Sequence, residues 1–556
     1  MMKKIYIVLI LAAMTTSSCE DYLNTEPTDK IALEQYYTDE DGLNHALAGV
    51  YDMLGSSSIY GNGIWKNLEV CTDEGYYARN TQTTGIQVNN YDPTNSDVSN
   101  YWRDLYVGIE RANDLIANIN VPKMDEAKRQ VILGEALFLR GYYYFMLVSR
   151  FGDVPLRLTP TTSPIGIQLA RTSSAAVYAQ ILQDMKEAEN KVAAAKYEYT
   201  GRVSKTVVQG IIARVCLQMA GYPLNDTSKY GEASEYAKKV IDSGERGLNV
   251  TFNSNPTFNT FNPTIATNTA NNAYRQIFIS EAQDLYDTNE NIWEVESKGN
   301  GTDGFNEMGG LGSQIGITFT DATLAPTIGY CYGFEKGTAR LFNKYDATGK
   351  DLRRDWVLTT YTLKVNGTTV TRTAIPFTAG NTYGRDVAKW RREYEAITPK
   401  NKNNSGINFP ILRYADVLLM YAEAENQVKG PTAAAQDAVN KVRRRAYGFP
   451  IGVANAISDM PATAIASSSA FQLFIEDERM RELCFEGLRR MDLIRWNKYV
   501  STLNSVGNEI STNTLNAGQK YGGLGGTNTA ARHLLFPIPS LEMSSNTLIK
   551  ENNPGW

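Results

Sequence analysis

The sequence predicts a mainly α-helical protein in which paired helices support an irregular, loop-rich half with a few short strands. Two observations carry this prediction. Apolar residues recur at three- and four-residue steps through the first half of the chain and again after residue 412, which is the period of one helix face. Between residues 247 and 411 that period is lost, and stretches rich in Gly, Asn, Thr and Pro replace it.

The composition narrows the class of function. The chain has 556 residues, with 55 Lys+Arg against 60 Asp+Glu, and its net charge of −5 argues against a nucleic-acid partner. Only 2 His are present, so zinc enzymes and hydrolases that use His as a base are disfavoured. The 33 Tyr, each an apolar ring with a polar tip, suit a protein that recognises a ligand at a wet surface.

The N-terminus has the pattern of a bacterial lipoprotein signal. Two lysines precede a short apolar run at residues 5–14, and small residues then lead to Cys19. We therefore expect residues 1–18 to be a signal peptide and Cys19 to be acylated, with a plain signal peptidase site as the alternative. Acyl chains on Cys19 would anchor the protein stably in a membrane.

Helical periodicity marks out the elements of the first part in order. A capping signal at residues 172–174 precedes one of these helices, and the turn at residues 221–225 separates the last two. The helices are expected over residues 36–54, 98–119, 125–150, 177–195, 205–221 and 230–243.

A second helix pair follows much later, over residues 412–429 and 432–446 around Gly430-Pro431. Helix–turn–helix units of about 34 residues resemble tetratricopeptide repeats, which stack to bury a continuous core. We expect one intertwined body with three parts after the signal peptide: an N-terminal tetratricopeptide-like part, a loop-rich insertion and a C-terminal helical part, at residues 19–246, 247–411 and 412–556.

The middle of the chain carries the expected strands. Residues 292–296 alternate as a short strand, and residues 361–365 and 368–373 flank the turn signal Asn366-Gly367, which predicts a hairpin. Residues 249–272 are rich in Asn, Thr and Pro and are expected to form a loop or an insertion.

The densest charged stretch is residues 475–496. It predicts one or two structural helices laced by pairs four residues apart, such as Glu486 with Arg490. The apolar residues that would face inward are Leu483, Leu488, Met491 and Ile494.

Motifs for chemistry are missing from the sequence. Gly349-Lys350 is followed by Asp351 and so does not complete a phosphate-binding loop. The chain has no HExxH, GxSxG or EF-hand pattern, and its Gly clusters at 309–316 and 522–526 miss GxGxxG spacing. We therefore expect a non-enzymatic protein with no catalytic residue, cofactor or metal. Asp73-Glu74 is the best local candidate for the carboxylate pair of a glycosidase.

Four cysteines besides Cys19 are widely spaced, so two disulfides of unknown pairing are possible. Cys216 and Cys484 lie among apolar neighbours in helical patterns, which favours buried free thiols. The other two are Cys71 and Cys331.

Aromatic and polar residues are interspersed with Gly, Asn, Thr and Ser between residues 60 and 97. Flat rings stack on sugar faces, while Asp, Asn and Arg bond hydroxyl groups, so this composition indicates a glycan site. The alternative is that several rings pack in the core or within loops, as we expect for Tyr101 and Trp102. The candidate residues are Trp65, Asp73, Tyr76, Tyr77, Arg79, Asn80 and Tyr91.

Several segments in order along the chain resemble the SusD/RagB family of outer-membrane nutrient-binding lipoproteins. They begin with CEDYLNTEP at Cys19 and end with NPGW at Trp556. Between these lie GEALFLRGYYYF at 134–145 with FGDVPL at 151–156, PILRYADVLLMYAEA at 410–424, ERMREL at 478–483 with FEGLR at 485–489, and LFPIP at 535–539.

The resemblance implies a lipid-anchored protein on the extracellular face of the outer membrane that caps a SusC-like TonB-dependent transporter and delivers oligosaccharide to it. Family ligand sites lie on loops, here 60–97 and roughly 280–335, which adds Tyr330 and Tyr332 to the candidates. The alternatives are a peptide ligand in the same capping role, a carboxylate-dependent surface glycosidase, and a repeat scaffold that binds only protein.

Overall fold

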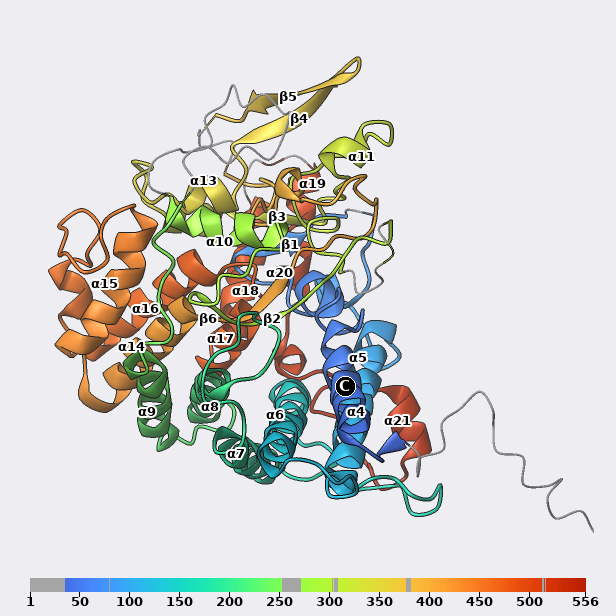
Figure 1. Cartoon of the computed structure of the whole chain (residues 1–556). Helices are drawn as coiled ribbons and strands as arrows, with labels where there is room; N and C mark the ends of the chain where they lie inside the picture. Colours follow the sequence, from blue (N-terminus) through green and yellow to red (C-terminus); the bar gives the residue numbers. More distant parts are fainter. Residues whose placement is uncertain are drawn as a thin grey trace, which may run out of the picture.

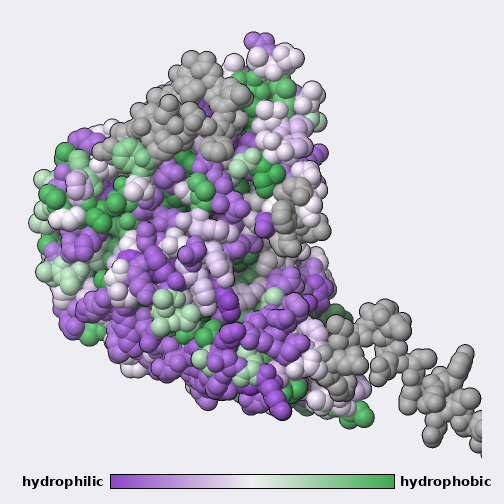
Figure 2. Space-filling view, in the orientation of Figure 1, coloured by the Kyte–Doolittle hydropathy of each residue, from purple (hydrophilic) through white to green (hydrophobic). Residues whose placement is uncertain are grey.

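The computed structural model describes residues 36–79, 81–252, 272–302, 304, 309–376, 382–512, 515 and 517–556. The predicted signal peptide, Cys19, Asn80 and most of the predicted 249–272 loop lie outside these residues. Helices occupy the lower and left parts of Figure 1, and short strands and loops lie above them. The helical part of the face shown in Figure 2 is largely hydrophilic.

The six helices predicted for the first part are confirmed. Polar side chains cap four of them, because Asp39, Asn95, Asp125 and Ser173 each accept a hydrogen bond from a first-turn backbone N–H. One end differs, since the helix predicted over 177–195 ends at Glu189. The helices are α4 (Glu40–Asp52), α5 (Ser96–Asn118), α6 (Glu126–Phe151), α7 (Ser174–Glu189), α8 (Lys205–Ala220) and α9 (Lys229–Asp242).

Helix α6 is the central helix of this part. Among the described residues it alone is long and apolar enough to cross a membrane, but 89% of its apolar window is buried inside the protein, as in a core helix. Three consecutive tyrosines on α6 are buried: the Tyr143 hydroxyl donates to the carbonyl of Val50 at 2.5 Å, and the Tyr144 hydroxyl donates to that of Arg157 at 2.7 Å. Much of the tyrosine excess therefore serves helix packing.

The late helix pair joins the early one in a single core. Helix α14 (Tyr414–Lys429) packs against both α8 and α9, and α15 (Ala433–Ala446) packs against α14. Ile211 of α8 and Leu418 of α14 belong to the same cluster of buried apolar side chains. Segments about 200 residues apart thus form one hydrophobic body, as stacked repeat units do.

Three two-stranded antiparallel sheets lie among the described residues. The predicted hairpin is confirmed, with Gly367 in the left-handed region (φ 62°) where glycine is favoured. The other two sheets join segments that are far apart in sequence. The pairs are β1 (Gly75–Tyr77) with β3 (Glu335–Gly337), β2 (Asn291–Val295) with β6 (Phe409–Arg413), and β4 (Tyr361–Asn366) with β5 (Thr369–Ala374).

The remaining described helices are shorter on average and belong to the loop-rich half and the C-terminal part. They are α10 (Ala273–Ala282), α11 (Ala325–Ile328), α12 (Ala339–Lys344), α13 (Arg354–Val357), α16 (Ser468–Leu483), α17 (Arg489–Arg495), α18 (Tyr499–Thr512), α19 (Ala517–Tyr521), α20 (Leu524–Asn528) and α21 (Ser540–Ser545).

The charged stretch at 475–496 forms α16 and α17, but its predicted pairing is wrong. Glu486 lies between the two helices, is buried, and pairs with Lys389 at 2.5 Å and Arg413 at 2.7 Å rather than with Arg490. The Arg490 guanidinium instead donates to the carbonyl of His533. These charges therefore tie the helices to other segments instead of facing solvent.

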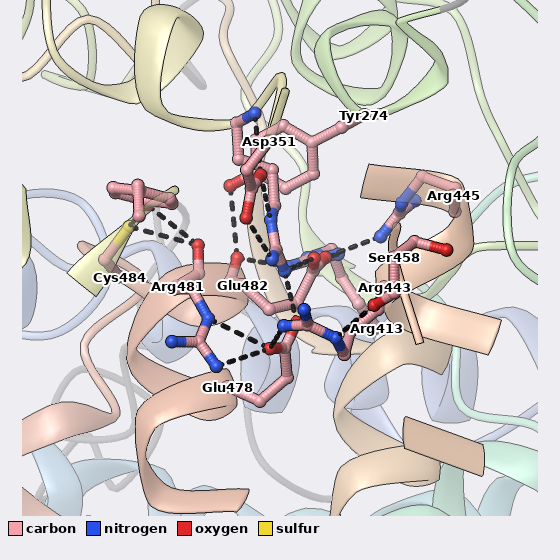
Figure 3. Close-up of polar contacts among 12 residues, drawn as sticks. Tyr274, Asp351, Arg413, Arg443, Arg445, Ser458, Glu478, Arg481, Glu482 and Cys484 are labelled. Atoms are coloured by element: carbon pink, nitrogen blue, oxygen red, sulfur yellow. Dashed lines mark hydrogen bonds and ion pairs between the residues drawn. The ribbon is translucent and has the colours of Figure 1, made fainter. Parts of the chain in front are cut away.

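A buried ionic cluster joins α16 to β6, α15 and the loop before α13 (Figure 3). Arg413 donates to Glu290 at 2.8 Å and to Glu482 at 3.0 Å, and all three side chains are fully buried. Burial alone would raise the pKa of Glu482, but Arg445, Arg413 and Arg353 outweigh it and lower the pKa to about 2. The further members are Asp351, Arg443, Glu478 and Arg481.

Cys71, Cys216, Cys331 and Cys484 are all buried and unbridged, so none of the described cysteines forms a disulfide. The free thiols expected for Cys216 and Cys484 are confirmed. Burial raises the pKa of Cys484 to about 12, which keeps this thiol protonated and unreactive.

Candidate ligand-binding site

Four aromatic rings stand in a row on the loop-rich half. Tyr332 and Phe334 are stacked with their centroids 5.0 Å apart, Tyr330 meets Tyr332 edge-on at 4.8 Å, and Tyr77 stacks on Phe334 at 5.7 Å. Tyr77 is buried, whereas the other three rings are partly exposed. We call Tyr77, Phe334, Tyr332 and Tyr330 the aromatic ladder.

Backbone hydrogen bonds of residues 330–334 place these rings. Gly333 has a positive φ of 62°, so the chain turns between Tyr332 and Phe334 instead of continuing as a strand. The backbone N–H of Tyr332 donates to the carbonyl of Ser313 at 2.9 Å, and that of Phe334 donates to the carbonyl of Gln314 at 3.0 Å. On the other edge, the N–H of Ala78 donates to the carbonyl of Phe334 at 2.7 Å, which brings the residues after β1 to the ladder.

Polar side chains surround the ladder. The Tyr332 hydroxyl donates to Asn403 Oδ1 at 2.9 Å. Lys402 Nζ lies 4.7 Å from the centroid of the Tyr330 ring, and Lys66 Nζ lies 5.9 Å from that of Phe334. Partly exposed rings beside hydrogen-bonding groups are the equipment for stacking on a sugar and bonding its hydroxyl groups.

The structure brings together some of the predicted residues. Tyr330, Tyr332 and Tyr77 belong to the ladder, and the exposed Arg79 lies beside it, where it opposes the rise that burial causes in the pKa of Tyr77. Asn80 lies outside the described residues.

The other predicted rings are buried elsewhere. Trp65 is 3% exposed and donates from its indole to the carbonyl of Tyr60, and the Tyr76 ring lies against Gly522. Tyr91 packs on Trp556 with centroids 4.8 Å apart. These three rings fill the interior because segments distant in sequence cover them, and we do not include them in the site.

Asp73 and Glu74 do not form an accessible carboxylate pair. Both are buried; Asp73 accepts two hydrogen bonds from Arg489, at 2.8 and 2.9 Å, and Glu74 accepts one from the backbone N–H of Phe485 at 2.8 Å. Neither carboxylate faces a cleft where a glycosidic bond would lie. Asp73 is therefore a structural residue that holds the loop before β1 to α17.

A buried carboxyl pair lies at the β1–β3 sheet: Glu335 belongs to β3, and Glu74 directly precedes β1. Burial raises the pKa of Glu74 to about 8, and burial together with the neighbouring Glu74 raises the pKa of Glu335 well above its usual range. Glu335 stands opposite Tyr77 in the strand register. Glu74 is therefore expected to be protonated in the folded protein below about pH 8, and burial likewise favours the protonated form of Glu335.

This pair predicts a loss of stability at alkaline pH. Because folding raises the pKa of Glu74, the stability it contributes is present at pH 4.5 and below and is lost as pH rises through about 8. Glu74→Gln cannot ionise, so it should not lose this stability. The difference in free energy of unfolding between Glu74→Gln and wild type, measured by urea denaturation, should therefore rise by a few kcal/mol as pH increases from 5 to 9. The half-exposed control Glu187→Gln should show no such gain, and equal behaviour of the two variants would refute the assignment.

Sequence reasoning missed part of the site: Phe334, Lys66, Lys402 and Asn403. The repetition Tyr330-x-Tyr332-x-Phe334 was a usable signal, because it concentrates three rings within five residues of a Gly-containing loop. No local pattern marks Lys66, Lys402 or Asn403. They reach the ladder only through tertiary packing.

A cavity of about 830 Å³ lies between α4 and the end of β2. Gly309 lines it, and Ser313 of the same loop holds Tyr332, so the cavity and the ladder are neighbours. Its polar groups are mostly engaged: Arg202 and Tyr51 both bond Glu135, at 3.0 and 2.7 Å. Tyr199 on its rim is 40% exposed. We favour the ladder because three of its rings are partly exposed and cationic side chains lie beside them.

Among the described ranges, no group of three or more His, Cys, Asp or Glu is arranged to hold a metal ion. The polar groups at the ladder are cationic side chains and an amide, which are not a divalent-metal ligand set.

Comparison with known proteins agrees with this architecture. Residues 289–556 match the SusD family, and residues 21–217 match a family described as starch-binding and associating with the outer membrane. SusD-like protein P2 of Formosa agariphila is 25% identical over 572 residues, covering 100% of both chains.

Solved structures share the fold. A SusD homolog from Bacteroides thetaiotaomicron superposes with a TM-score of 0.81 at 27% identity, covering 94% of this chain and 98% of that one. A laminarin binding SusD-like protein gives a TM-score of 0.67 at 22% identity, covering 94% of this chain and 100% of that one. The two family matches, which together span most of the chain, and the relatives from Formosa agariphila and Bacteroides thetaiotaomicron show that this is a SusD-like family protein.

Proposed function

We propose that this protein is a non-enzymatic glycan-binding lipoprotein of the outer membrane. It captures oligosaccharide on the cell surface and delivers it to a SusC-like TonB-dependent transporter. Acyl chains on Cys19 anchor it to the membrane, which leaves the folded body free to close over the transporter. The family description as starch-binding and associated with the outer membrane supports this proposal.

The observation that carries the proposal is the aromatic ladder. Three partly exposed rings, Tyr330, Tyr332 and Phe334, lie next to one another on one short segment, with Asn403 and Lys402 beside them. Partly exposed aromatic rings provide apolar contact for sugar rings, and side-chain amide and ammonium groups bond sugar hydroxyls. A relative of the same fold is a laminarin binding protein, which supports a glycan as the class of ligand.

Binding without cleavage tests the proposal. The soluble form that lacks residues 1–19 contains all the described residues, so it is the protein to use. In native gels that contain polysaccharide, it should migrate more slowly than in plain gels, while bovine serum albumin should not. Incubation with the retarding polysaccharide should release no reducing ends. Failure to bind any polysaccharide in a broad panel would refute the proposal, and released reducing ends would favour the glycosidase alternative.

A further inference from the structure

Cationic side chains stand at both ends of the aromatic ladder. Lys402 lies over Tyr330 and Tyr332, with Nζ 4.7 and 5.9 Å from the two ring centroids. At the other end, Lys66 lies over Phe334 and the exposed Arg79 follows Tyr77. This local excess of positive charge contrasts with the net charge of −5 of the whole chain.

None of these three cations has an anionic partner among the described residues. Lys336, two residues after Phe334, differs from them because it forms an ion pair with Asp386. For Lys66, Arg79 and Lys402, no carboxylate oxygen of the described residues comes within the 4.0 Å of an ion pair. An uncompensated cation beside an apolar ring is costly to desolvate unless an incoming anion neutralises it.

Lys66 is the most constrained of the three. Burial lowers its pKa, and the nearby Arg79 lowers it further, although Asp97 acts in the opposite direction. The Asp97 carboxylate is held by the amide of Asn67 at 2.9 Å instead of by the ammonium group. Two neighbouring cations that repel each other thus remain available to one anionic group.

The acidic side chains around the ladder do not neutralise Lys66, Arg79 or Lys402. Glu395 is bound by Arg392 at 2.8 Å, and Asp386 is bound by Lys336. Glu335 is buried, and burial raises its pKa and favours its protonated form. Among the described residues, Asp97 is the carboxylate that opposes the lowering of the Lys66 pKa, and its side chain is bonded by Asn67.

From this arrangement we propose that the ladder selects an anionic glycan, whose sugar rings contact the exposed parts of the aromatic side chains while its carboxylate or sulfate groups meet Lys66, Arg79 and Lys402. This inference rests on the proposed function, because it names the ligand class of the same site. Carboxylate and sulfate share the chemistry that these cations recognise. Cations at both ends of the row favour a ligand that carries more than one negative charge.

The experiment compares acidic and neutral polysaccharides in native gels. The probes are polygalacturonate, which carries carboxylates, chondroitin sulfate, which carries both groups, its desulfated form, and the neutral laminarin and amylopectin. At least one acidic polysaccharide should retard the protein more strongly than either neutral one. Retardation should weaken between about 0.05 M and about 0.5 M NaCl, because salt shortens the Debye length.

Variants separate the charges from the rings. Lys66→Met, Arg79→Met and Lys402→Met should each weaken binding of the acidic polysaccharide by about 5-fold, and the triple variant by more. Lys123→Met is the matched control, since it removes one exposed positive charge from the turn between α5 and α6 and should change nothing.

Two results would overturn the inference, and they differ in meaning. If only a neutral polysaccharide binds, and Tyr332→Ala abolishes that binding, the anionic selectivity is wrong but the glycan-binding function stands. If no polysaccharide binds at all, the proposed function itself fails. Equal retardation by chondroitin sulfate and its desulfated form would identify the carboxylate as the recognised group, and loss on desulfation would identify the sulfate.

Discussion

Replacing Arg413 with Ala is expected to lower the free energy of unfolding by about 3–5 kcal/mol or more. Arg413 is fully buried and donates to Glu290, Glu482 and Glu486 at 2.7–3.0 Å. Removing its guanidinium leaves these carboxylates close together in the interior with fewer cations to balance them. The loss is measured by urea denaturation followed by circular dichroism.

Two further variants make this result interpretable. Lys441→Ala removes an ion pair with Asp437 at 2.9 Å whose partners are 38% and 47% exposed, so it should cost less than about 1 kcal/mol. Glu482→Gln keeps the side-chain volume but removes the charge that Arg413 binds, and it should also lower the free energy of unfolding. It replaces Arg413→Ala in the experiment if Arg413→Ala does not fold well enough to measure. Losses no larger than that of Lys441→Ala would show that the buried cluster contributes little.

Removing two rings of the ladder should have the largest effect on ligand affinity. Tyr332→Ala/Phe334→Ala takes away a stacked pair, and aromatic anchors of this kind are worth about 1–3 kcal/mol each, or roughly 30- to 20,000-fold together when the two losses add. Both side chains are partly exposed, so the fold should survive. The affinity is measured by titration calorimetry with whichever oligosaccharide wild type binds, and the fold is checked by circular dichroism.

Tyr199→Ala is the matched control for this variant. Tyr199 is an exposed ring on the rim of the 830 Å³ cavity, and its removal should leave the affinity unchanged. If Tyr199→Ala loses affinity and the ladder variant does not, the cavity beside α4 is the ligand site. A ladder variant that binds as wild type does would remove the ladder from the function.

The helices were predictable because their information is local. The 3.6-residue period and the capping residues Asp125 and Ser173 mark α6 and α7 without reference to the rest of the chain. The hairpin at Asn366-Gly367 is equally local. Pairings across large sequence separations were not predictable in this way, and the partner of Glu486 shows why: Lys389 and Arg413 are 97 and 73 residues away.

The candidate site was predicted only in part, because some of its residues come together only when distant segments pack. Tyr330 and Tyr332 lie in a loop that the family resemblance indicated, and their alternation with Phe334 is readable from the sequence. Whether Trp65 or Tyr91 is exposed depends on segments that fold over them, such as Trp556 on Tyr91. An aromatic residue in a Gly- and Asn-rich stretch therefore does not reveal whether it faces a ligand or the interior.

The most direct measurement is a crystal structure of the soluble protein with an oligosaccharide that it binds. Sugar rings should lie over Tyr330, Tyr332 and Phe334, with a hydroxyl near Asn403 and negatively charged groups near Lys402 and Lys66. Density for the oligosaccharide in the cavity between α4 and β2, with the ladder bare, would contradict the ladder as the ligand site.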